Sequence, residues 1–112
     1  MHSVARAVGD VRILNWSGKI TLGEGTTEVR NTVREIIESG GKKIVINLAD
    51  VSYIDSAGVG ALIGAYVTVT NKGGQLRLMN LTKKVHELLA ITKLLTVFDV
   101  FNTEEAARSS FN

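Results

Sequence analysis

Asp55 and Ser56 are the residues whose types and position best suit chemistry in this chain. They stand within residues 51–64, V-S-Y-I-D-S-A-G-V-G-A-L-I-G, where an apolar strand-like run passes into a segment of small residues. A hydroxyl at the start of a helix lies among unpaired backbone N–H groups and at the positive end of the helix dipole, which favours a phosphate group there. Ser56 is therefore our leading candidate for a regulatory phosphorylation site.

The same two residues have a simpler interpretation as a helix cap. Aspartate and serine are both preferred N-cap residues, and a turn from strand to helix commonly needs one. Catalysis fits less well, because a nucleophile elbow requires glycine two residues before the serine, where this chain has Ile54. The only histidines are His2, near a terminus, and His86, on a predicted surface helix. We predict that the chain is not an enzyme.

Three glycines, Gly58, Gly60 and Gly64, follow the serine with the spacing G-x-G-x-x-x-G. This spacing is one residue longer than the dinucleotide fingerprint and lies after the turn, so we interpret the glycines as allowing a helix to pack closely on a sheet. Asp50 and Asp55 are too few ligands for magnesium or calcium. The sequence predicts neither a cofactor nor a metal.

Composition places the chain among small globular domains. Its 112 residues are 45% hydrophobic and 21% charged, without proline or cysteine, and we expect one domain over residues 1–112. The lack of cysteine and of an apolar stretch near the roughly 20 residues that span a bilayer favours a cytoplasmic protein without membrane insertion. The net charge of +2 is mild, and no aromatic residues alternate with basic ones, so nucleic-acid binding is not expected.

The N-terminal part is predicted to form a hairpin followed by a helix. Residues 3–8 and 11–16 are β-prone and are separated by the tight-turn pair Gly9-Asp10. Residues 27–39 carry apolar side chains at helical spacing.

The start of this helix is open to two interpretations. Thr21 and Glu24 match a capping box that would begin the helix earlier, whereas Gly25 inside the helix would be unfavourable. Gly40 and Gly41 supply the stop at its other end.

Residues 44–48 are predicted to be a central strand covered on both faces, and residues 76–79 a second strand of this kind beside it. Parallel neighbours need a crossover of about a dozen residues, usually helical. Residues 66–70, Y-V-T-V-T, have strong strand propensity, but the need for a crossover favours one helix over residues 57–71. The face expected to be buried comprises Val59, Leu62, Ile63, Tyr66 and Thr70.

The C-terminal part completes the pattern. Thr82 is a predicted N-cap for a helix over residues 83–91, a strand is expected near residues 97–100, and Asn102 or Thr103 caps a last short helix. The order β-β-α-β-α-β-α-β-α predicts an α/β domain with a mixed, mostly parallel sheet of about four to five strands, an N-terminal hairpin and about four helices.

These residues carry a family resemblance. Residues 47–62, N-L-A-D-V-S-Y-I-D-S-A-G-V-G-A-L, resemble the signature of the anti-sigma-factor antagonists, the bacterial STAS domains. Gly18, taken as the end of the second strand, and the segments 73–76 and 95–106 also occupy positions where that family has related features. The resemblance covers nearly the whole chain and implies the STAS fold.

The resemblance implies a phosphoprotein switch that regulates transcription. The serine matching Ser56 is phosphorylated by an anti-sigma factor that is also a serine kinase. The unphosphorylated form binds that kinase and frees the sigma factor, and a serine/threonine phosphatase of the metal-dependent class resets the switch. ATP and magnesium then belong to the kinase, and this chain needs no cofactor of its own.

We assign roles on this basis. Ser56 accepts the phosphoryl group, and Asp55 orients the loop and the partner. Phosphorylation would add roughly −1.5 to −2 charge beside Asp55 and would oppose close packing by a partner. The residues expected to leave room for that approach are Ala57, Gly58 and Gly60. We also expect partner contacts from the exposed side of the helix over residues 57–71 and from the loop at residues 18–23.

One segment departs from the family pattern. Many members carry acidic residues just after the glycine matching Gly18, whereas this chain has Lys19, Ile20 and Thr21. A reversed local charge predicts a different choice of partner, or a loop that does not touch the kinase.

Two other functions compete with the prediction of an anti-sigma factor antagonist. STAS domains also serve as subunits or tails of membrane transporters for lipids or anions and as components of stress-sensing scaffolds, where this chain would be a constitutive interaction module. A small-molecule or nucleotide-binding module is less favoured, because no convergent polar pocket can be identified from the sequence.

Overall fold

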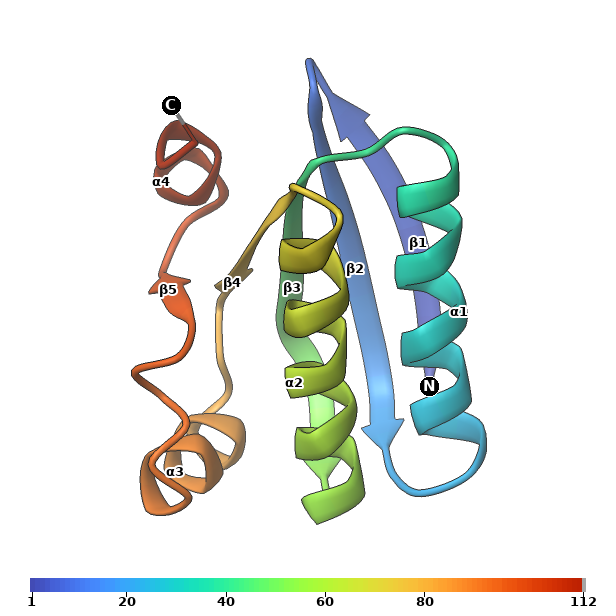
Figure 1. The fold of residues 1–112 in the computed structure, drawn as a ribbon. Helices are drawn as coiled ribbons and strands as arrows, with labels where there is room; N and C mark the ends of the chain where they lie inside the picture. Colours follow the sequence, from blue (N-terminus) through green and yellow to red (C-terminus); the bar gives the residue numbers. More distant parts are fainter. Residues whose placement is uncertain (112) are drawn as a thin grey trace.

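Strand-prone and helix-prone segments alternate along the chain, and the fold follows that alternation (Figure 1). The computed structural model describes residues 1–111. The elements in order are β1 His2–Val8, β2 Val11–Ile20, α1 Glu24–Glu38, β3 Lys43–Ile54, α2 Ser56–Asn71, β4 Gln75–Met79, α3 Lys83–Ile91, β5 Asp99–Phe101 and α4 Glu104–Ser109.

Within the described residues, five strands form one sheet in the order β1-β2-β3-β4-β5. β1 and β2 are antiparallel, and the remaining neighbours are parallel. The hairpin turns at Gly9, whose φ of +62° lies in the left-handed region that glycine adopts easily. The sheet confirms the predicted mixed α/β architecture and the central position of β3.

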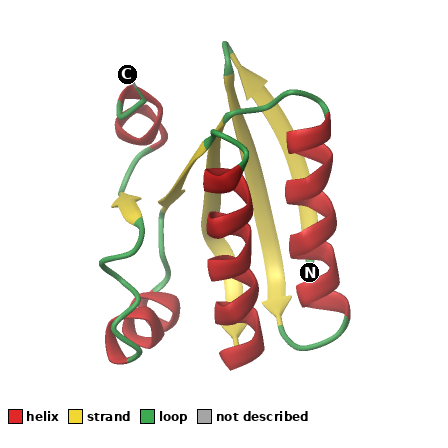
Figure 2. Ribbon diagram, viewed as in Figure 1, coloured by secondary structure: helices red, strands yellow, loops and turns green. Residues whose placement is uncertain are grey.

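The two faces of the sheet are covered unequally (Figure 2). α1 and α2 lie side by side on one face, over the larger apolar cluster that includes Trp16, Ile46 and Leu62. α4 lies on the opposite face, where Ala107 and Phe111 join a smaller cluster. Most of the apolar burial, and therefore most of the hydrophobic stabilisation, lies in the larger cluster, to which α3 also contributes Val85 and Leu89.

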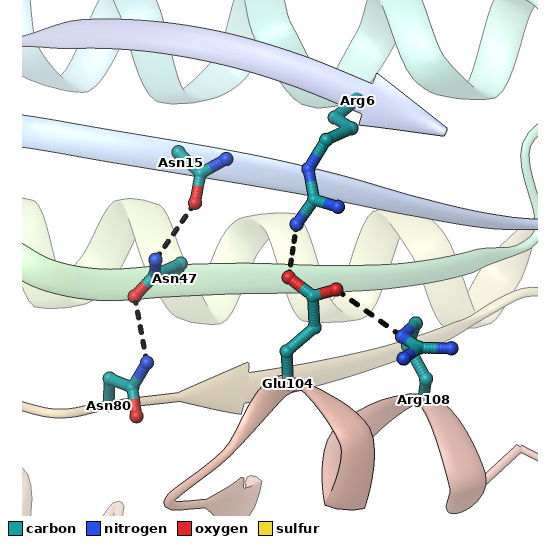
Figure 3. A network of polar contacts seen from close by, with 6 residues as sticks. All are labelled: Arg6, Asn15, Asn47, Asn80, Glu104 and Arg108. Atoms are coloured by element: carbon teal, nitrogen blue, oxygen red, sulfur yellow. Dashed lines mark hydrogen bonds and ion pairs between the residues drawn. The ribbon is translucent and has the colours of Figure 1, made fainter. Parts of the chain in front are cut away.

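Polar contacts cross the face that α4 covers (Figure 3). The Asn47 Nδ2 atom donates to Asn15 Oδ1 at 2.8 Å, and Asn80 Nδ2 donates to Asn47 Oδ1 at 3.4 Å. Glu104 bridges Arg6 of β1 and Arg108 of α4. These contacts join strands and helix to each other, and we interpret the network as structural.

α1 begins at Glu24, so the earlier of the two predicted starts is correct, although the cap differs. The N-cap is Gly23, whose N–H donates to the Thr26 hydroxyl at 3.2 Å. Gly25 lies inside the helix because a Cβ there would stand 3.0 Å from the Lys19 carbonyl oxygen. Its close packing against β2 explains why a residue that disfavours helices occupies the first turn.

Residues 66–70 are helical, as the crossover argument predicts, and belong to α2. The predicted buried face is wrong at one position, because Thr70 is exposed whereas Ala65 and Val69 are buried. Helix α2 therefore rests on the sheet through a stripe rotated slightly from the predicted one.

Strand boundaries also differ from the predictions, and β3 continues past the predicted residues 44–48 to Ile54. β2 continues past Gly18 to Ile20, with an irregularity in its register against β3 between Gly18 and Lys19. Gly18 has a φ of +91°, so it marks a bulge inside the strand and not its end. The last strand comprises Asp99–Phe101, slightly later than the predicted 97–100.

Candidate functional site

The candidate site forms where β3 ends and α2 begins. Ile54 is buried at the end of the strand, and the backbone N–H of Asp55 donates to the Ile20 carbonyl at 3.3 Å. Asp55 remains extended, with φ −101° and ψ −177°, and α2 starts at the next residue, Ser56. The buried strand therefore delivers both predicted residues to the surface, as the sequence suggested.

The Asp55 carboxylate makes two hydrogen bonds that join separate segments. Its Oδ1 atom accepts from the Gly58 backbone N–H at 2.8 Å, so Asp55 is the N-cap of α2. Its Oδ2 atom accepts from the Leu22 backbone N–H at 3.1 Å, in the loop between β2 and α1. The Gly58 N–H, followed by that of Leu22, lowers the pKa of Asp55, because both donors stabilise the ionised form.

Ser56 occupies the first position of α2 and is exposed. Its hydroxyl has no hydrogen-bond partner among the described residues, so it is accessible to a reacting group from outside. The two interpretations offered by the sequence thus separate: Asp55 caps the helix, and Ser56 has no capping role. The geometry leaves a free hydroxyl at the positive end of a long helix.

The glycines of α2 serve two different purposes. A Cβ at Gly58 would stand 2.2 Å from the Ile20 carbonyl oxygen, so this glycine lets α2 approach β2 closely. A Cβ at Gly60 or Gly64 would meet no heavy atom within 4 Å. The packing interpretation is correct for Gly58 and wrong for Gly60 and Gly64, which face open space. Conversely, the room provided by Gly58 is filled by this chain and not left for a partner.

Exposed apolar side chains surround the junction, and the sequence analysis did not single them out. Leu22, whose N–H is held by Asp55, is 78% exposed, and Ile91 of α3 is 76% exposed. Tyr53, two residues before Asp55, lines a shallow pocket of about 290 Å³ together with Ile91. Ile91 lies off the buried stripe of its helix, which is the one signal from which its exposure could have been inferred.

Two further observations concern residues 1–111. These residues contain no group of three or more His, Asp and Glu side chains that could hold a metal ion. In the same part of the chain, no helix has the length and apolar character needed to cross a bilayer.

A match over nearly the whole chain gives the class of protein. The family model for the STAS domain matches residues 2–107, and the chain belongs to that family.

Particular relatives make the likeness more specific. The chain is 40% identical to an anti-sigma-B factor antagonist of Bacillus subtilis over 60 residues, which are 54% of this chain and 55% of that protein. The match therefore spans about half the length of this relative.

Solved structures extend the likeness across nearly the whole fold. The phosphorylated form of the Bacillus cell fate determinant SpoIIAA has a TM-score of 0.75 at 19% identity, covering 99% of this chain and 100% of that one. A sulfate transporter family protein from Wolinella succinogenes has a TM-score of 0.79 at 18% identity, covering 94% of this chain and 87% of that one. At such identities, the likeness concerns the fold.

Proposed function

We propose that this protein is an anti-sigma factor antagonist switched by phosphorylation of Ser56. In the unphosphorylated form it binds an anti-sigma factor that is also a serine kinase, and the bound kinase releases its sigma factor. A serine/threonine phosphatase of the metal-dependent class removes the phosphate and restores binding. The protein itself needs no cofactor, because the kinase supplies the ATP and magnesium.

The observation that carries this proposal is the exposed Ser56 hydroxyl at the first position of α2, with no hydrogen-bond partner among the described residues. Asp55 already performs the capping, so the serine is not needed there for stability. The relative from Bacillus subtilis, named an anti-sigma-B factor antagonist, supports the same role.

The switch acts through charge and bulk at one surface. Unphosphorylated, the junction presents a small neutral hydroxyl beside exposed Leu22 and Tyr53. A phosphate adds roughly −1.5 to −2 charge next to the ionised Asp55, and a partner packed on these apolar side chains would meet both repulsion and steric overlap. A change of about 1.4 kcal/mol in binding free energy already alters affinity tenfold, so no change of fold is required.

Within this proposal, the five predicted site residues have distinct roles. Ser56 accepts the phosphoryl group, and Asp55 holds the loop at Leu22 in place. Ala57 and Gly60 present a small surface to the partner, because Ala57 is half-buried and Gly60 has open space above it. Gly58 acts from inside by seating α2 against β2.

The test is a pull-down from native-cell lysate with the wild-type protein and the Ser56→Asp variant, identifying bound proteins by mass spectrometry. We expect the wild-type protein alone to capture a serine kinase related to histidine kinases. Lys83→Asp is a matched control, because it places the same side chain at the first position of α3, and it should bind like the wild type.

The likeness in fold to a sulfate transporter family protein suggests a competing outcome. If the wild-type protein and Ser56→Asp capture the same membrane-transporter or scaffold subunits, the protein is a constitutive interaction module and the antagonist proposal is wrong. Incubating the captured kinase with Ser56→Ala provides a second check, since undiminished phosphorylation would place the modified residue elsewhere.

A further inference from the structure

A groove of about 760 Å³ runs between α1 and α2, on the outer side of the helical layer. It is lined by small residues of α2, including Ala57, Ala61 and Gly64, and by apolar residues of α1, including Val33 and Ile37. A Cβ at Gly64 would meet no atom within 4 Å, so the missing side chain deepens the groove. Because Ala57 directly follows Ser56, one end of the groove adjoins the proposed phosphorylation site.

The residues that line the groove recur every three or four positions along both helices. On α2 they run from Ala57 to Thr68, with Lys72 just after the end of the helix, and on α1 from Thr26 to Glu38. At 1.5 Å of rise per residue, about 15 residues of helix correspond to roughly 22 Å. A groove that is open along this length matches an extended occupant such as a helix, which lays anchors at intervals of three and four into such a surface.

The charges at the rim select the chemistry of the occupant. Arg30, Arg34 and Lys72 line the groove, and their charged groups make no hydrogen bond or ion pair with any described residue. Glu38 is the one acidic residue among the described residues that line it. Cations that are unpaired in the free protein are complementary to carboxylates of a partner and would steer its approach.

We infer that this groove docks an amphipathic helix with an acidic flank, supplied by the kinase that modifies Ser56. The inference rests on the proposed function and adds to it a second contact surface and the sign of the partner's charge. The helix places small and apolar side chains over Ala61 and Gly64 and carboxylates opposite Arg30 and Arg34. Docking along α2 holds the kinase beside the start of the same helix, where Ser56 is presented.

The test uses the kinase captured by the wild-type protein and measures KM and kcat for phosphorylation of Ser56. Gly64→Leu adds a large side chain to the groove. A Cβ at this position meets no other heavy atom within 4 Å, and leucine is a better helix former than glycine, so the variant should fold. The double variant Arg30→Glu/Arg34→Glu reverses the rim charge. We expect each to raise KM by at least about tenfold while kcat changes little, because docking is lost and the acceptor is not.

Matched controls place the same changes elsewhere on the surface. Ala106→Leu adds leucine at an exposed position of α4, and Lys83→Glu reverses an exposed charge on α3, and both should keep the wild-type KM. Unchanged KM in both groove variants would overturn the inference and leave the switch intact. A kinase that binds without modifying Ser56 would instead refute the proposed function, and Kd values for the same variants would still test the groove.

Discussion

Helices α2, α3 and α4 begin in the same way but differ in what surrounds the start. Each follows a side chain that accepts from the backbone N–H three residues later: Asp55 at 2.8 Å, Thr82 at 3.3 Å and Thr103 at 3.1 Å. The first helical residue is Ser56 in α2, Lys83 in α3 and Glu104 in α4. Capping alone therefore does not distinguish the candidate site.

The difference lies in the second oxygen of Asp55 and in the residue that follows it. Threonine has a single side-chain oxygen, whereas the Asp55 carboxylate also accepts from Leu22 and so joins the loop to the junction. At α4, Glu104 is engaged with Arg6 and Arg108. Only at α2, within the described residues, does a capped helix present a free hydroxyl at its first position. The start of α2 thus differs from the other two helix starts by the hydrogen bond to Leu22 and by a serine hydroxyl that is unpaired among the described residues.

The strongest test of this comparison exchanges the first residues of two helices. Ser56→Ala should reduce phosphorylation by the captured kinase to background, because the acceptor oxygen is removed, while thermal stability hardly changes. Lys83→Ser creates an exposed serine at a capped helix start and should not gain phosphate. Mass spectrometry of each protein after incubation with the kinase and ATP checks both results, and phosphate on the serine introduced in α3 would mean that any capped helix start suffices.

The next effect concerns the packing that seats α2. Gly58→Ala should destabilise the fold by about 3 kcal/mol, because its Cβ would press on the Ile20 carbonyl oxygen, 2.2 Å away, and α2 would have to shift. Gly60→Ala, two residues further along the same helix, should stabilise the fold by about 0.5 to 1 kcal/mol, since a Cβ there would meet no heavy atom beyond the adjacent helix backbone within 4 Å. Urea unfolding measures both, and equal effects would contradict the two purposes assigned to these glycines.

A smaller effect is expected at the cap of α3. Thr82→Ala should cost about 1 kcal/mol of unfolding free energy, because the Val85 N–H loses its acceptor. The affinity for the captured kinase should remain unchanged, since this cap has no link to the loop at Leu22. A large loss of kinase binding without unfolding would show that the functional surface extends to α3.

The smallest expected effect is the pH dependence of the stability that the two Asp55 hydrogen bonds provide. The pKa of Asp55 is lowered in the folded protein, so its charge adds stability that is present above the ordinary value of 3.8 and is lost as the pH falls through the folded pKa. The wild type should therefore be more stable than Asp55→Asn at pH 7, and the gap should close in acid. Urea midpoints measured from pH 7 down to about pH 2 follow this convergence.

The difference in stability between the wild type and Asp55→Asn isolates the contribution of Asp55 from those of other groups. Lys43 lowers the pKa of Asp10 by a hydrogen bond and by its charge, but this contribution is common to both proteins and cancels. A stability difference that stays constant into acid would show that the Asp55 hydrogen bonds do not depend on the charge of the carboxylate.

Much of the fold could be predicted because its signals are local. The apolar run of β3, the caps Thr82 and Thr103 and the glycines after α1 act within a few residues of chain, and all are found as expected. The helical state of residues 66–70 required a topological argument, because strand propensity pointed the other way. The start of α1 remained undecided because Gly25 is justified by contact with β2, which no local pattern records.

The sequence by itself determined the order of elements, the central strand, the family resemblance and the Asp55-Ser56 pair at a strand-to-helix turn. Only the tertiary structure decided which of the two caps the helix, where Gly58 packs, and that Leu22 is tied to Asp55 across 33 positions of sequence. The groove between α1 and α2 also exists only after folding. The physical reason is that propensities and caps depend on neighbouring residues, whereas these contacts depend on how β2, α1 and α2 meet in space.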